Sequence, residues 1–175
     1  GLGQKTFTIA YVGYSSTNPF WNALAASARK SAKNLSINFL DLTASAADMA
    51  QQKTAVDNAI IRGVDGLLIG AVDSRGLGDS FDKAQAAGIQ IVTVDTRVDH
   101  PAVRSHIATD NIAAANLAGE YIAERLNNKG KVLILGGSTG SQTADDRQKG
   151  VEEILHRHTD MEIIFRVANW DAKQA

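Results

Sequence analysis

The chain has 175 residues, a length that suits one ordinary domain or two small ones. Its 18 Lys and Arg residues against 19 Asp and Glu residues give a net charge of -1, which excludes a large basic surface for nucleic acid or an anionic membrane. Hydrophobic residues make up 44% and charged residues 21% of the chain, so a disordered protein is excluded. No apolar run approaches the roughly 20 residues of a membrane helix, and the lack of cysteine excludes disulfides and thiolate catalysis.

Runs rich in β-branched residues alternate along the chain with stretches of helical spacing. The predicted strands span residues 6–12, 37–42, 66–70, 89–94, 131–135 and 162–167. Strands separated by helices of this length indicate βαβ crossovers and parallel sheets, so the predicted fold class is α/β.

Each predicted helix except the last follows a polar side chain that can accept a hydrogen bond from a free N–H group of the first turn. These residues are Asn18, Ser45 with Asp48 as a capping box, Asp73 and Asp110, and the fifth helix is expected over residues 143–156. Pro19 suits the first turn of the first helix because its missing N–H has no partner there, and Gly88 is typical of a helix end.

A short extended segment at residues 104–108 interrupts the alternation. An added strand at this point indicates a crossing between two sheets, which places a domain boundary near Thr109 and Asp110. The predicted domains are residues 1–109 and 110–175. The second holds two strands and two helices, few for an independent sheet, so we expect an incomplete lobe. We therefore expect either a dimer of the chain or weak hydrogen-exchange protection from about residue 112 onward.

Polar and aromatic side chains gather where the predicted strands end, the edge at which ligands bind in open α/β sheets. The predicted ligand-binding residues are Asn18, Phe20, Trp21, Asp95, Thr96, Arg147 and Trp170. Carboxylate, amide and guanidinium groups supply directional hydrogen bonds to hydroxyls, and flat aromatic rings cover the apolar C–H faces of a sugar ring. The combination therefore indicates a site for a neutral polyol.

Taken together, these segments resemble the ribose-type periplasmic sugar-binding proteins. The resemblance rests on Asn18-Pro19-Phe20-Trp21 after the first strand, Val94-Asp95 at the end of the fourth, Ser105-His106-Ile107-Ala108-Thr109-Asp110-Asn111, and the helix with Arg147. It is collinear over residues 6–175. It implies the type I periplasmic-binding-protein fold, with two doubly wound parallel-sheet lobes, the second of them incomplete in this chain.

The resemblance also implies roles for individual residues. The aromatic residues that would stack on the sugar are Phe20, Trp21 and Trp170, and the hydrogen-bonding residues are Asn18, Asp95 and Arg147. Thr109 and Asp110 match the first hinge crossing of the family. Thr96 stands where ribose-like members often carry Arg, which leaves the identity of the sugar open.

Other chemistries find less support in the sequence. Residues 136–140 satisfy G-x-S-x-G after a strand, but an α/β-hydrolase needs a later His, and the last one, His158, lies only 20 residues past Ser138. The same loop lacks the Gly-Lys-Ser/Thr of a P-loop. His156 and His158 point to different faces of a helix and make a poor metal pair. We therefore expect no enzyme activity, no metal and no cofactor.

We predict a protein that closes its two lobes on one monosaccharide and delivers it to an ABC-transporter permease or a chemoreceptor, without being embedded in a membrane. Its expected location is the periplasm or another extracytoplasmic space, after removal of a signal peptide. The alternative is the ligand-sensing core of a LacI-type transcription regulator, which shares this architecture. Such a regulator carries an N-terminal helix-turn-helix, and the first strand, which begins at Thr6, leaves no room for one, so no nucleic-acid partner is expected.

Overall fold

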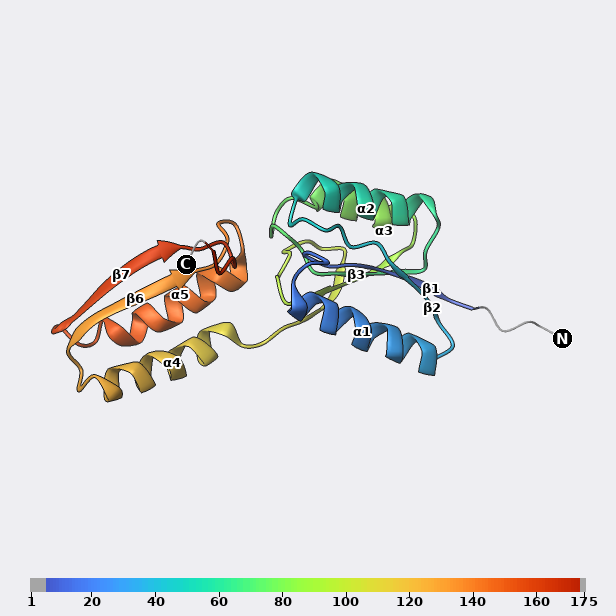
Figure 1. Ribbon diagram of the computed structural model, residues 1–175. Coiled ribbons are helices and arrows are strands. Elements are labelled where there is room, and N and C mark those ends of the chain that lie inside the picture. The colour runs from blue at the N-terminus through green and yellow to red at the C-terminus, as the bar shows by residue number, and fades with distance from the viewer. Residues whose placement is uncertain (1–5, 174–175) are drawn as a thin grey trace. The chain divides into compact units, whose positions relative to one another are not determined.

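The computed structural model describes residues 6–173, and the chain divides into two compact units, Gly1–Ile107 and Ala108–Ala175. The first unit thus ends at Ile107, where the sequence predicted an end at Thr109. The first five and last two residues of the predicted domains lie outside the described residues. Strands and helices alternate along the described chain, except that two strands follow each other over residues 90–107, as predicted (Figure 1).

Within residues 6–107, the first unit is a five-stranded parallel sheet with helices on both faces (Figure 1). The strand order is β2-β1-β3-β4-β5, and the strands are β1 (Thr8–Val12), β2 (Asn38–Asp41), β3 (Gly66–Ile69), β4 (Gln90–Val94) and β5 (Val103–Ile107). The helices are α1 (Pro19–Asn34), α2 (Met49–Ile61) and α3 (Gly78–Ala86). Helix α1 covers one face of the sheet and α2 and α3 cover the other, which is the doubly wound arrangement predicted from the sequence.

The caps of α1 and α2 confirm one sequence prediction and correct another. Asn18 caps α1, because its Oδ1 accepts a hydrogen bond from the N–H of Phe20 at 2.9 Å. Helix α2 is capped by Asp48, whose Oδ1 accepts from the N–H of Gln51 at 2.8 Å. The predicted capping box with Ser45 is therefore wrong, since α2 begins at Met49 and its N-cap is Asp48, three residues after Ser45.

Asp73 does not cap α3, contrary to the prediction. Its Oδ1 accepts from the N–H groups of Arg75 at 2.7 Å and Gly76 at 3.0 Å, which forms a separate turn, and α3 begins only at Gly78. Asp side chains readily bond to backbone N–H groups two or three residues ahead, so this carboxylate is satisfied before the helix begins. Gly88 follows the end of α3 with a φ of 75°, as predicted for a helix stop.

Strand β5 lies at the edge of the first sheet and pairs in parallel with β4, with a register shift between Ile91 and Val92. The sequence predicted a strand here as the sign of a crossing between two sheets. The predicted strand is present as the edge strand of the first sheet, and the chain enters the second unit after it.

Two apolar clusters hold the first unit together, because successive residues of a strand point to opposite faces of the sheet. On one face, Leu67 and Ile69 of β3 pack with Val56 of α2 and Phe81 of α3, and all four are buried. The buried residues of the other cluster are Tyr11, Trp21, Ala25 and Val94. Trp21, predicted to contact a ligand, is therefore also a core residue of this unit.

The second unit, described over residues 108–173, contains one parallel strand pair and two helices. The strands are β6 (Gly130–Gly136) and β7 (Met161–Val167), and the helices are α4 (Asn111–Arg125) and α5 (Gln142–Leu155). Asp110 caps α4 as expected, its Oδ1 accepting from the N–H of Ala113 at 3.0 Å. Helices α4 and α5 approach each other closely at Gly150, where a Cβ would stand 2.7 Å from the carbonyl oxygen of Ile112.

Both helices of the second unit pack on the same face of the strand pair (Figure 1). On the other face, Leu133 and Leu135 of β6 are 56% and 47% exposed. A dimer of the chain, predicted from the sequence, stays a prediction. Within residues 6–173, each helix is too short or too polar to reach across a bilayer.

Candidate functional site

The side chain of Gln52, on α2, forms hydrogen bonds with backbone groups that follow the carboxyl ends of β1 and β3. Its side-chain nitrogen donates to the carbonyl oxygens of Gly13 at 3.1 Å and Gly70 at 2.9 Å, and its side-chain oxygen accepts from the N–H of Val72 at 2.8 Å. The residue is 2% exposed, so these bonds satisfy backbone groups that water does not reach. Gln52 was not among the residues predicted from the sequence, because a glutamine within a helix is more typical of a solvated face.

Replacing Gln52 with methionine keeps a similar volume and removes these three hydrogen bonds. We expect Gln52→Met to lower the free energy of unfolding by about 3 kcal/mol, since each buried polar group left without a partner costs roughly 1–3 kcal/mol. Urea denaturation followed by circular dichroism measures this loss. The control is Gln51→Met at the neighbouring exposed position, which should change the same quantity by less than about 0.5 kcal/mol. Equal effects of the two substitutions would contradict the role of the buried amide.

Phe20 and Trp21 begin α1 side by side but lie in different environments. Trp21 is 5% exposed, its ring is stacked on Tyr14 with centroids 5.9 Å apart, and it covers Gly70 so closely that a Cβ there would overlap the ring. Phe20 is 54% exposed and meets Trp21 edge-on at 5.1 Å. Adjacent residues of a helix point in different directions, so one of the two faces the core and the other does not. Contact of either ring with a sugar stays a prediction.

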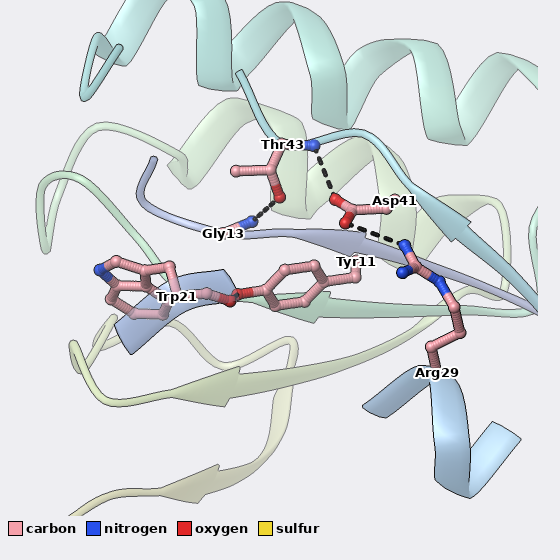
Figure 2. Close-up of polar contacts among 6 residues, drawn as sticks. All are labelled: Tyr11, Gly13, Trp21, Arg29, Asp41 and Thr43. Carbon is pink, nitrogen blue, oxygen red and sulfur yellow. Dashed lines mark hydrogen bonds and ion pairs between the residues drawn. The ribbon is translucent and has the colours of Figure 1, made fainter. Parts of the chain in front are cut away.

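A series of polar contacts holds the loop that follows β1 (Figure 2). The N–H of Gly13 donates to Thr43 Oγ1 at 2.8 Å, and the N–H of Thr43 donates to Asp41 Oδ1 at 3.2 Å. Arg29 of α1 pairs with the other carboxylate oxygen of Asp41 at 3.3 Å. These contacts connect α1 and the end of β2 to the start of the loop that leads to Asn18.

Tyr11, near the end of β1, is fully buried and donates its hydroxyl to the carbonyl oxygen of Trp21 at 3.4 Å (Figure 2). Burial raises the pKa of Tyr11 strongly, and the negative charges of Asp41 and Asp95 raise it further. The hydroxyl is therefore neutral at physiological pH.

Asp95 directly follows β4 in a left-handed backbone conformation, with a φ of 62° that Asp adopts more readily than most residues. Its N–H donates to the carbonyl oxygen of Ile107 at 2.9 Å. Thr96 is 2% exposed, and its hydroxyl donates to Asp95 Oδ2 at 3.5 Å. The hydroxyl of Thr96 is thus hydrogen-bonded to the carboxylate of Asp95. The predicted contact of Thr96 with a ligand stays a prediction.

His106 of β5 lies near this turn, with its Nδ1 2.9 Å from Thr93 Oγ1. Burial lowers the pKa of His106 below its usual 6.5, and the positive charge of Arg97 lowers it further, against the opposing influence of Asp95 and Thr93. The folded protein therefore binds this proton less readily than the unfolded chain does.

The sign of the pH dependence follows from this lowered pKa. We expect the contribution of His106 to stability to be complete above its ordinary pKa of 6.5 and to be lost as the pH falls below that value. Thermal melts at about pH 7.5 and about pH 5.5 measure the effect, and His106→Gln should make the melting temperature less sensitive to this change. The same sensitivity in His106→Gln would show that another group titrates.

In the second unit, Arg147 of α5 contacts both Asn111 and Trp170. Its Nε donates to Asn111 Oδ1 at 2.8 Å, and its guanidinium carbon lies 5.4 Å from the centre of the Trp170 ring, a cation–π geometry. The ring covers Gly137 so closely that a Cβ there would overlap it. The structure thus brings two predicted residues together and adds two, Asn111 and Gly137, that the sequence analysis did not assign to the site. No local sequence pattern could have indicated these two residues, because their contact partners are far apart in the sequence.

The predicted ligand residues are therefore divided between the two units. Those of the first unit are Asn18, Phe20, Trp21, Asp95 and Thr96, and those of the second are Arg147 and Trp170. Thr109 and Asp110 are exposed beside the unit boundary, and their role as a hinge stays a prediction. Within residues 6–173, no three His, Asp or Glu side chains are grouped so that they could hold a metal ion.

Three comparisons relate the chain to known proteins. It is 32% identical over 164 residues to the ribose import binding protein RbsB of Escherichia coli (strain K12), a match that covers 94% of this chain and 55% of that protein. It is similar to an ABC transporter solute-binding protein from Mycobacterium smegmatis with bound glycerol, with a TM-score of 0.91 and 27% identity over 97% of this chain and 59% of the other. A periplasmic solute-binding protein from Actinobacillus succinogenes 130z with bound D-allose gives a TM-score of 0.87 and 26% identity over 97% and 62%.

The chain spans little more than half the length of each of these proteins. A family described as periplasmic binding protein domain matches residues 9–175, which include both units. The similar structures share the parallel α/β architecture, so the predicted type I fold is confirmed. The resemblance inferred from the strand ends is confirmed as well, and the chain belongs to the periplasmic binding protein domain family.

Proposed function

We propose that this chain binds a monosaccharide and works in a solute-binding protein of an ABC transporter. The observation that carries the proposal is the pairing of Arg147 with Trp170 beyond the carboxyl ends of β6 and β7. An indole that is 39% exposed retains accessible apolar surface, and the guanidinium over its ring offers several N–H donors to hydroxyl oxygens. The ribose import protein and the D-allose-bound structure described above support the same class of ligand.

The first unit supports the proposal with a similar combination of groups at its own strand ends. Phe20 is half exposed at the start of α1, and Asp95 follows β4 on the same sheet. A carboxylate accepts hydrogen bonds from hydroxyls, which complements the donors of Arg147. We propose that the side-chain amide of Asn18 also binds the sugar. We propose that Thr96 contributes to the site through its hydroxyl, which donates to the Asp95 carboxylate at 3.5 Å.

We propose that the two units close on the ligand by bending at Thr109 and Asp110. A ligand that contacts both units stabilises the closed arrangement by the difference between its affinities for the two states. The role is transport without chemical change of the sugar, so we propose no catalytic residue and no cofactor. Delivery to a permease or a chemoreceptor, in the periplasm or another extracytoplasmic space, completes the proposal. The transport proteins among the relatives favour it over a transcription regulator.

Calorimetric titration of the chain with D-ribose, D-allose and xylitol tests the proposed function. L-leucine serves as a control ligand of comparable size that carries charged groups and few hydroxyls. We expect saturable binding of at least one polyol and no binding of leucine, because the candidate residues match neutral hydroxyls and C–H faces. Failure to bind any of the three polyols, or binding of leucine alone, would contradict the proposal.

A further inference from the structure

The guanidinium of Arg147 is held by two neighbours in the second unit. Asn111 Oδ1 accepts from its Nε at 2.8 Å, and the ring of Trp170 lies against it, 5.4 Å from ring centre to guanidinium carbon. The ring is placed in turn by Gly137, which has no side chain to displace it. A long arginine side chain that is ordered before a ligand arrives loses less conformational freedom on binding.

Asn111 occupies an unusual place for a buried amide. It is the first residue of α4, directly after the cap Asp110, and it is 6% exposed. Asparagine favours helices less than alanine does, and a buried amide is costly without a hydrogen-bond partner. The partner of Asn111 is Arg147, 36 residues further along the chain on α5. The contribution of this side chain therefore lies in the contact between α4 and α5 rather than in the helix itself.

We propose that Asn111 is a positioning residue of the sugar site, which orients Arg147 through its Nε. The inference rests on the proposed function, because it assumes that Arg147 binds the ligand. The bond uses one of the five N–H donors of the guanidinium, and the four on the terminal nitrogens are those that would meet sugar hydroxyls. Because Asn111 is the fourth residue of the second unit, it also connects the start of α4 with the proposed ligand-binding group.

The experiment compares Asn111→Ala with a matched substitution on the same helix. Asn116 lies further along α4 and also faces α5. Its side-chain nitrogen donates to the carbonyl oxygens of Ile112 at 3.3 Å and Gly150 at 2.8 Å, in the amide orientation that gives both the oxygen and the nitrogen suitable partners. Asn116→Ala therefore removes contacts between the two helices without touching Arg147. The variants are titrated with D-ribose, D-allose and xylitol, and the Nε–H signal of Arg147 is followed by NMR in each.

We expect Asn111→Ala to weaken polyol binding by about threefold to tenfold, which corresponds to about half a decade to one decade in the dissociation constant. The Arg147 Nε–H should then exchange faster with water, and Asn116→Ala should change neither quantity. In an Arg147→Met background, Asn111→Ala should have no further effect on affinity, because the group it orients is gone.

Two results would overturn the inference while polyol binding itself persists. One is an affinity of Asn111→Ala within twofold of the unsubstituted chain. The other is a loss of affinity on Asn111→Ala that is equally large in the unsubstituted chain and in the Arg147→Met background. That result would mean that Asn111 does not act through Arg147. If the unsubstituted chain binds none of the three polyols, the proposed function fails, and the positioning role fails with it even where the Nε–H signal shows that Asn111 holds Arg147.

Discussion

Arg147→Met is expected to weaken polyol binding by about tenfold to a hundredfold. A hydrogen bond to a charged group contributes about 1.5–3 kcal/mol, and 1.4 kcal/mol corresponds to one decade in affinity. The matched control is Arg157→Met in the same unit, which removes an exposed arginine paired with Glu153 at 3.1 Å. Surface pairs of this kind contribute little, so the affinity should remain unchanged in the control. Calorimetric titration of both variants with the same polyols gives the comparison.

Asp95→Asn tests the candidate carboxylate of the first unit and should also weaken polyol binding by about tenfold to a hundredfold. Asparagine adopts the left-handed conformation of this position as readily as aspartate does, so the turn after β4 is preserved. The substitution removes the charge and converts one acceptor oxygen into a donor. A lower melting temperature with unchanged affinity, in this variant or in Arg147→Met, would remove that residue from the site.

Trp21→Ala is expected to lower the free energy of unfolding by about 3–5 kcal/mol, the usual range for removal of a buried aromatic side chain. Trp21 is 5% exposed, packs with Tyr11 and Val94, and stacks on Tyr14 at 5.9 Å. The empty volume would lie next to Gly70, which has no side chain to fill it. Urea denaturation followed by far-ultraviolet circular dichroism measures the loss.

Phe20→Ala is the matched comparison at the neighbouring position. Phe20 is 54% exposed and its ring meets Trp21 edge-on, so the expected loss in the free energy of unfolding is about 1 kcal/mol. Its effect on polyol affinity should be larger than its effect on stability, if the exposed ring covers the sugar. A loss in the free energy of unfolding as large as that of Trp21→Ala would show that both rings contribute to the packing of the core.

The elements and their order could be predicted because their signals are local. Alternation of β-branched runs with helical spacing depends on neighbouring residues, and so do the caps Asn18 and Asp110. Parallel strands joined by helices bring their carboxyl ends to one edge, so the position of Asp95 directly after β4 followed from the same reasoning. Asp73 misled the prediction because an Asp side chain closes a turn as readily as it caps a helix.

The tertiary structure decided what the candidate residues touch. Gln52 bonds to Gly13, 39 residues away, and Asn111 bonds to Arg147, 36 residues away, and no local spacing indicates either pair. Whether Phe20 or Trp21 entered the core depended on how α1 packs on the sheet. The sequence by itself determined the fold class and the order of the candidate binding residues along the chain. The packing of helices on sheets decided which of these groups are held or buried, because a hydrogen bond or a ring contact needs positions in space that only distant segments together supply.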